Sequence, residues 1–219
     1  MAFSNENKPV YYPPFEEKLN ILSHGFGFLL SLIGLVLLII KAIELGEPLH
    51  IISFSIFGAS MILLYAASTF YHSATSLKRR YVLNIIDHAC IYILIAGTYT
   101  PFALITLHGW MGWTLFSLVW IMALTGIILK LFFIGRFQTF STIMYVVMGW
   151  IIVVFLKPLL SSLSLSGVVL LFLGGGLYTV GAILFSLDKI KYNHAIFHLF
   201  VLGGTFCHFL VIYNYVLPV

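Results

Sequence analysis

The chain has 219 residues, of which 61% are hydrophobic and 8% are charged, whereas soluble domains are about half apolar and about a quarter charged. The formal net charge is +4, but in so apolar a chain basic residues first report membrane orientation, and nothing in the sequence supports a nucleic-acid partner. This composition excludes an ordinary soluble domain and predicts an integral membrane protein.

Apolar runs long enough to cross a bilayer recur along the whole sequence. A membrane-spanning helix needs about 20 residues to cross a hydrocarbon core of about 30 Å, and the alternating segments of about 10 residues that mark outer-membrane strands are absent from the sequence. We therefore predict an all-α integral membrane bundle of seven transmembrane helices. The predicted spans are residues 21–41, 50–72, 82–106, 112–133, 139–157, 165–187 and 194–217.

The segment before the first span differs in composition from the rest of the chain. Residues 1–15 are polar and contain three prolines, which predicts a short flexible cytoplasmic tail. The first span follows the acidic pair Glu16 and Glu17 and has no cleavage site after it, so we expect it to remain as a helix rather than to be removed as a signal peptide. Residues 16–219 are then predicted to form a single transmembrane domain.

Basic residues indicate how the bundle lies in the membrane. With the N-terminus inside the cell, nine of the eleven Lys and Arg residues lie on the cytoplasmic side, and only Lys41 and Lys157 lie outside. Positive residues concentrate in the cytoplasmic loops of membrane proteins. The sequence therefore predicts a cytoplasmic N-terminus and an external C-terminus.

Small residues predict where helices approach each other closely. Gly167, Gly174 and Gly181 recur every seven residues on the predicted sixth helix, a stripe typical of tight helix packing in membranes. A phosphate-binding loop is disfavoured because no loop-to-helix context surrounds these glycines. Cys90 and Cys207 both lie inside predicted spans, so a disulfide framework is not expected.

Ionisable side chains inside the spans require an explanation, since each costs about 2.5–3.5 kcal/mol at the centre of a membrane helix. Asp87 is the only carboxylate within the predicted spans, because the other acidic residues fall in predicted tails or loops. His50 and His108 lie near predicted external loops, where a solvated or structural role is expected. The histidines inside the bundle are His24, His72, His88, His194, His198 and His208.

Four of these residues are predicted to reach one face of the membrane. His194 and His198 are four residues apart, which places both imidazoles on one side of a helix, as chelation of a metal requires. His72 ends the second span, and Asp87 lies near the start of the third span. In the predicted topology all of these positions lie toward the cytoplasm.

Their depths in the membrane also agree. His72, Asp87 and His198 each lie six or seven residues from the nearest cytoplasmic basic residue, which corresponds to about 9–11 Å at about 1.5 Å per residue. His194 lies about 5 Å deep by the same measure. Three imidazoles and one carboxylate at a common depth predict a metal site, and a buried polar network without metal is the alternative.

Zinc is the metal that this ligand set favours. Neutral imidazoles with a carboxylate or water suit zinc, and they suit iron, copper or nickel less well. Calcium and magnesium are disfavoured because they require more oxygen ligands.

Five motifs occur together along the chain. They are residues 68–72 (STFYH), 87–88 (DH), 95–102 (IAGTYTPF), 148–150 (MGW) and 193–204 (NHAIFHLFVLGG). With these motifs the sequence resembles the bacterial hemolysin III family, which is similar to the progestin and adipoQ receptors (PAQR), including the adiponectin receptors. The resemblance covers nearly all of the chain from Glu17 onward and implies a multi-pass protein of the bacterial inner membrane with its N-terminus inside.

The resemblance also implies roles for particular residues. In the receptors a histidine that ends helix 2 and two histidines on helix 7 hold zinc, and these match His72, His194 and His198. A helix 3 aspartate that contacts zinc through water matches Asp87. Ser68 matches a serine shared with the wider superfamily that includes alkaline ceramidases.

The remaining interior positions have less defined roles. Glu17, Asn20 and His24 resemble a helix 1 signature of the bacterial branch, and for His24 a local structural role is favoured over direct support of the metal site. His88, directly after the aspartate, points about 100° away on the helix and is not expected to bind the same metal. His208 is expected to form an interhelical hydrogen bond.

Two functions remain open from the sequence. In the first, the protein hydrolyses a lipid amide, ceramide-like by resemblance, with Asp87 and Ser68 as catalytic residues. Zinc with three protein ligands keeps a position open for water, and the base must come from another helix because the His194–His198 motif lacks the glutamate of HExxH. In the second, the zinc is structural and the protein is a pore-forming hemolysin, a channel, or a signalling or membrane-homeostasis protein. Membrane lipids are the expected partners, and the sequence does not settle the oligomeric state.

Overall fold

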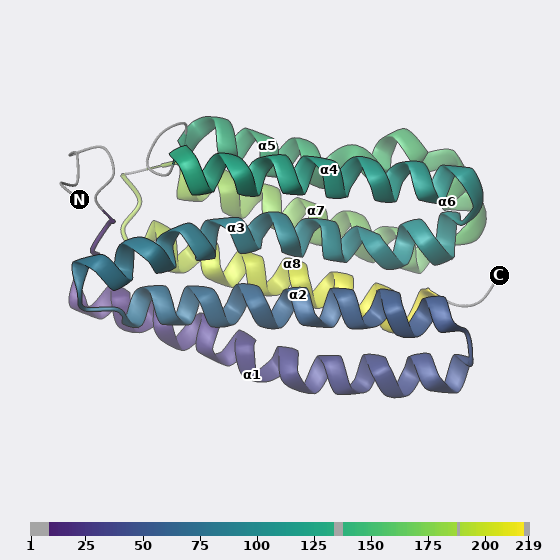
Figure 1. The fold of residues 1–219 in the computed structure, drawn as a ribbon, viewed down its shortest axis with the longest axis horizontal. Helices are drawn as coiled ribbons and strands as arrows, with labels where there is room; N and C mark the ends of the chain where they lie inside the picture. The colour runs from purple at the N-terminus through teal and green to yellow at the C-terminus, as the bar shows by residue number, and fades with distance from the viewer. Residues whose placement is uncertain (1–8, 134–137, 188, 217–219) are drawn as a thin grey trace.

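The computed structural model describes residues 9–133, 138–187 and 189–216, and the regular secondary structure in these ranges is all helical (Figure 1). Seven of its helical segments are long and apolar enough to cross a membrane, which confirms the predicted number of spans. The elements are α1 (Pro14–Leu45), α2 (Pro48–Ser73), α3 (Leu77–Pro101), η2 (Phe102–Leu107), α4 (Gly109–Phe133), α5 (Gln138–Trp150), η3 (Ile151–Phe155), α6 (Leu156–Ser162), α7 (Leu165–Phe185) and α8 (Asn193–Tyr215).

The helices form one bundle in which neighbours in sequence pack side by side. Helix α2 packs on α1 and α3, α7 packs on α8, and α8 also contacts α1, so the first and last spans meet. Helices α1, α3 and α8 begin at the same end of the bundle, where α2 ends, and α8 ends at the opposite end (Figure 1). We call the end where α1, α3 and α8 begin the site end.

Local sequence signals explain where several helices start and stop. Pro14 and Pro48 occupy the first turns of α1 and α2, where a missing amide hydrogen costs nothing. Gly46 ends α1 in the left-handed conformation, with φ of 74°, which glycine adopts without a steric penalty. The hydroxyls of Ser76 and Ser164 accept hydrogen bonds from amides in the first turns of α3 and α7.

The start of the first helix corrects one part of the sequence interpretation. Helix α1 begins at Pro14 rather than near residue 21, so Glu16 and Glu17 lie in its first turn and not in a tail or loop. Acidic residues in this position are stabilised by the positive end of the helix dipole. Asp87 is therefore not the only carboxylate in a membrane-length helix.

Two spans contain irregular turns that the sequence pattern did not predict. The third candidate span, Leu77–Leu107, ends in the π-helical segment η2 after Pro101. The fifth, Thr139–Ser162, changes from α5 through the 3₁₀ segment η3 to α6. Pro158 near this change has no amide hydrogen, which interrupts the regular ladder of helix hydrogen bonds.

The glycine stripe of α7 packs as predicted. Gly167, Gly174 and Gly181 are buried, and side chains of α8 occupy the space beside each of them. A methyl group at Gly174 would collide with the ring of His208, and one at Gly181 would lie 2.7 Å from Cβ of Phe200. The close packing of α7 on α8 fixes the position of the helix that carries His194 and His198.

Candidate metal centre

Three histidines meet at the site end of the bundle. His72 lies in the last turn of α2, and His194 and His198 lie in the first turns of α8. Nε2 of His194 is 3.0 Å from Nε2 of His72 and 3.1 Å from Nε2 of His198. All three residues are buried, and they offer ring nitrogens that lie within 4.8 Å of one another. This cluster could bind a metal ion, as the spacing and depth arguments predicted.

The other ring nitrogen of each histidine has its own partner. Nδ1 of His72 lies 2.8 Å from Oε2 of Glu17, and Nδ1 of His194 lies 3.0 Å from the hydroxyl of Tyr12. Nδ1 of His198 lies 3.2 Å from the Ser23 hydroxyl. Such partners fix the tautomer and orientation of metal-binding histidines.

The chemistry of this donor set fits a cation. A carboxylate only accepts hydrogen bonds, so Nδ1 of His72 carries the hydrogen and its Nε2 presents a lone pair to the cluster. With His194 and His198 in the same tautomer, three lone pairs converge on one point. Without a cation this arrangement is repulsive, whereas a metal ion held by all three nitrogens would satisfy them.

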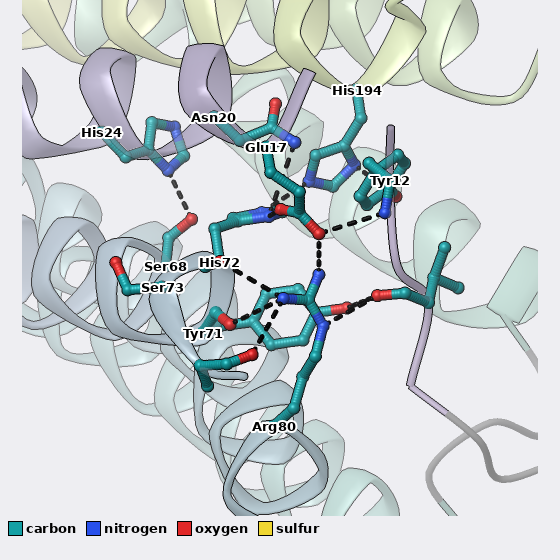
Figure 2. A network of polar contacts seen from close by, with 12 residues as sticks. Tyr12, Glu17, Asn20, His24, Ser68, Tyr71, His72, Ser73, Arg80 and His194 are labelled. Atoms are coloured by element: carbon teal, nitrogen blue, oxygen red, sulfur yellow. Dashed lines mark hydrogen bonds and ion pairs between the residues drawn. The ribbon is translucent and has the colours of Figure 1, made fainter. Parts of the chain in front are cut away.

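A buried arginine organises the polar network around the cluster (Figure 2). The Arg80 guanidinium pairs with the Glu17 carboxylate, and it also donates to the backbone oxygens of Tyr71 and His72. Glu17 thus joins Arg80 to His72. Because these contacts involve α1, α2 and α3, they hold three helices in register at the site.

Asp87 and Ser68 lie beside the cluster rather than in it. The Ser68 hydroxyl is 2.7 Å from Nδ1 of His24, and Ser68 and Asp87 line the same cavity. The ring of His24 stacks on that of His198, with ring centres 3.5 Å apart and planes at 7°. His24 therefore contacts both a cluster histidine and the serine, a closer association with the site than the structural role favoured from the sequence.

A cavity of about 150 Å³ extends from the cluster into the bundle. His194, His198, Asp87 and Ser68 line its start, and most of the remaining lining side chains are apolar or aromatic. The cavity continues between α3, α5, α7 and α8. Gly149 of α5, which is exposed and lies within a candidate span, is one of the lining residues.

The other histidines lie outside the cluster. Nδ1 of His88 is 2.9 Å from the backbone oxygen of Asn84 one turn earlier, consistent with the expectation that His88 points away from the metal. His208 donates from Nε2 to the backbone oxygen of Leu171 at 3.1 Å, which confirms the predicted interhelical hydrogen bond. His108 is exposed at the opposite end, whereas His50 is buried there and is not solvated.

For three residues of the site the sequence predicts no contact with the ligands. Glu17 matches a helix 1 signature but lies outside the predicted spans. Arg80 is one of the basic residues that indicate orientation and depth, and Tyr12 lies in the predicted tail. The signal they share is a position in the chain near the cytoplasmic end of a predicted span, the end that carries the predicted ligands. Such a position does not reveal direct contact. Burial raises the pKa of the Tyr12 phenol well above its usual value, so its hydroxyl stays protonated at neutral pH.

The Glu17→Gln variant tests the support that the Glu17 carboxylate gives to His72. The amide keeps the size of the side chain but cannot hold the same charge-assisted hydrogen bond, and loss of such a partner typically lowers metal affinity about 10–100-fold. We expect a fall of this size in zinc affinity, measured by competition with a chelator. Glu47→Gln, at an exposed position at the other end of the bundle, is the control, and equal affinities for the two variants would contradict the role of Glu17.

Comparison with known proteins agrees with this picture. The family model described as Haemolysin-III related matches residues 13–209. Hemolysin-3 of Bacillus cereus is 49% identical over 203 residues, which cover 93% of each chain. The Hemolysin-3 homolog of Bacillus subtilis (strain 168) is 52% identical over 204 residues, covering 93% of this chain and 96% of the relative.

A more distant similarity extends to animals. Monocyte to macrophage differentiation factor of Homo sapiens is 26% identical over 226 aligned positions, which cover 97% of this chain and 91% of the human protein. The family match spans all of α1 through α7 and most of α8, and therefore includes all three histidines of the cluster. This chain is a multi-pass membrane protein that belongs to the haemolysin-III related family.

Proposed function

We propose that the three histidines hold zinc and that the protein is a zinc-dependent hydrolase of lipid amides. Imidazole nitrogens suit zinc, whereas calcium and magnesium require oxygen ligands that this cluster does not offer. Catalytic zinc sites typically have three protein ligands and one open position, while structural sites have four. His72, His194 and His198 supply three ligands, which favours the catalytic type.

The residues around the cluster would have separate roles in the hydrolysis. A bound zinc ion supplies Lewis-acid chemistry, because it polarises a carbonyl group and makes water more acidic. The carboxylate of Asp87 is the base that takes a proton from the attacking water and returns it to the leaving amine. The hydroxyl of Ser68, which lines the same cavity as Asp87 and lies 2.7 Å from Nδ1 of His24, would orient that carboxylate.

The single observation that carries the proposal is the mainly apolar cavity that begins at the cluster. It starts at Asp87 and His198 and reaches His208, ten residues further along α8, or about 15 Å. Its lining suits an acyl chain, and an opening beside the exposed Gly149 would admit a substrate from the bilayer. A pore would instead require a polar path across the membrane, and this lining is mainly apolar.

Hydrolysis by metal-loaded and metal-free protein tests the function. Purified protein, either loaded with zinc or stripped by a chelator, is incubated with ceramides and other lipid amides while released fatty acid is measured. We expect release by the loaded form alone, restored when zinc is returned. Dye leakage from liposomes is followed in parallel, and leakage without fatty-acid release would replace the hydrolase proposal with the pore.

We also propose that the site end faces the cytoplasm of a bacterial cell, in the inner membrane. The bias of basic residues supports this orientation, and membrane lipids would be the partners of the outer surface. When a reporter enzyme is fused after Val219, we expect to find its activity outside the cytoplasm and none inside the cell. Activity of that fusion inside the cell would contradict the orientation and leave the cluster itself untouched.

A further inference from the structure

The described residues before α1 lie across the site end. Pro9 is buried, and the backbone oxygen of Val10 accepts hydrogen bonds from Nε of Arg80 at 2.9 Å and from the hydroxyl of Tyr71 at 3.3 Å. The hydroxyl of Tyr11 donates to the backbone oxygen of Thr75 at 3.3 Å. This segment, residues 9–13, is tied to the end of α2 and the start of α3, and we call it the strap.

Tyr12 places the strap directly on a cluster histidine. Its ring stacks on that of His194, with ring centres 4.6 Å apart and planes at 27°, and its hydroxyl lies 3.0 Å from Nδ1 of the same residue. Its amide donates to Oε1 of Glu17 at 3.0 Å, the carboxylate that also holds His72. Tyr12 thus contacts one cluster histidine, His194 on α8, directly. It also contacts the carboxylate that holds a second, His72 on α2 (Figure 2).

Arg80 fastens the strap to the bundle. Its guanidinium lies between two aromatic rings, 4.3 Å from the centre of Tyr11 in the strap and 4.7 Å from the centre of Tyr71 on α2. It binds both the Glu17 carboxylate and the Val10 backbone oxygen. A single buried cation therefore fixes the strap and the support of His72 together.

We infer that the strap closes the metal site on the side that faces water, with Tyr12 as the closing residue, so that it governs the exchange of metal and water with the aqueous phase. The inference rests on the proposed metal site, and it gives that site a route for metal and water that is separate from the route for lipid. On the lipid side the cavity is lined by the exposed Gly149 of α5, where a lipid would enter, whereas the strap lies outside the membrane-length helices. Hydrolysis of a lipid amide consumes both a lipid and water, and the two openings would admit them separately.

Kinetics of zinc exchange test the strap independently of enzyme activity. Zinc release from loaded protein is followed with a chromogenic chelator, and zinc uptake is followed with stripped protein. Tyr12→Phe keeps the ring over His194 and removes only the hydroxyl, whereas Tyr12→Ala removes both. Tyr213→Ala, at the opposite end of α8, is the control.

A closing residue and a positioning residue have different kinetic effects. If Tyr12 closes the site, Tyr12→Ala raises both the release and the uptake rates, each by about tenfold or more over Tyr12→Phe, while Tyr213→Ala matches wild type. Tyr11→Ala, an exposed position in the strap, raises both rates to a smaller extent and carries the test if Tyr12→Ala does not fold.

Other results overturn the inference. Faster release with unchanged uptake would mean that Tyr12 only positions His194, and rates equal to those of Tyr12→Phe would mean that the strap closes nothing. In both cases zinc binding by wild type would leave the proposed metal site intact. Wild-type protein that takes up no zinc would instead remove the site and the role of the strap together.

Discussion

Replacement of His194 by alanine is expected to reduce bound zinc from about one ion per chain to almost none. His194 is the central member of the cluster, since its Nε2 lies 3.0 Å from that of His72 and 3.1 Å from that of His198. The remaining two histidines would form a site with two protein ligands, fewer than either structural or catalytic zinc sites use. Elemental analysis of the purified variant, with zinc supplied during purification, gives the measurement.

Two control variants separate loss of a ligand from loss of any histidine. His108→Ala changes an exposed residue at the opposite end, and His88→Ala changes a cavity-lining residue whose Nδ1 bonds to its own helix. Both are expected to retain wild-type zinc. If His88→Ala loses as much zinc as His194→Ala, or if wild type folds without zinc and gains none when it is added, the assignment of the three ligands is wrong.

The fold and the ligand set follow from local patterns, which explains why the sequence predicted them. A membrane helix leaves a long apolar run, and a polar residue inside such a run is costly, so Asp87 and the interior histidines stand out individually. The spacing of His194 and His198 and the direction of each span then bring these residues to one depth. Each step uses one helix at a time and needs no knowledge of packing.

The support around the ligands arises from contacts between helices and could not be predicted in this way. Glu17 lies at the start of α1, Arg80 at the start of α3, and Tyr12 in the segment before α1. Polar residues are common at helix starts and in segments outside helices, so none of the three stands out in the sequence. The packing of α1, α2, α3 and α8 on one another brings them to the cluster. The predicted start of the first span was the deciding error, because it left Glu17 out of the carboxylates within the spans.

The arrangement also explains why a carboxylate at residue 17 and one at residue 87 can have different roles. Glu17 is paired with Arg80 and with Nδ1 of His72, so it orients the His72 ring through the nitrogen that faces away from the cluster. Asp87 and Ser68 line the cavity on the side where a substrate would lie. A substitution at position 17 should therefore act on metal affinity, and one at position 87 on chemistry.

Asp87→Asn is the variant that best separates catalysis from metal binding. We expect it to keep the fold and nearly all of the bound zinc, because Asp87 is not among the three residues whose nitrogens converge. Loss of a general base typically lowers the rate about 10²–10⁴-fold, so hydrolysis of the best lipid amide should fall by that factor. Zinc content and released fatty acid are measured on the same preparation.

The matched variant Ser68→Ala tests whether the effect comes from the carboxylate itself. It removes the hydroxyl that would orient Asp87 and leaves the carboxylate in place, so its rate should lie between those of wild type and Asp87→Asn, again with zinc retained. Asparagine at position 87 with full activity would mean that another group accepts the proton. Parallel loss of zinc and activity would instead place Asp87 among the ligands, and the activity data would then no longer distinguish a base from a metal-binding residue.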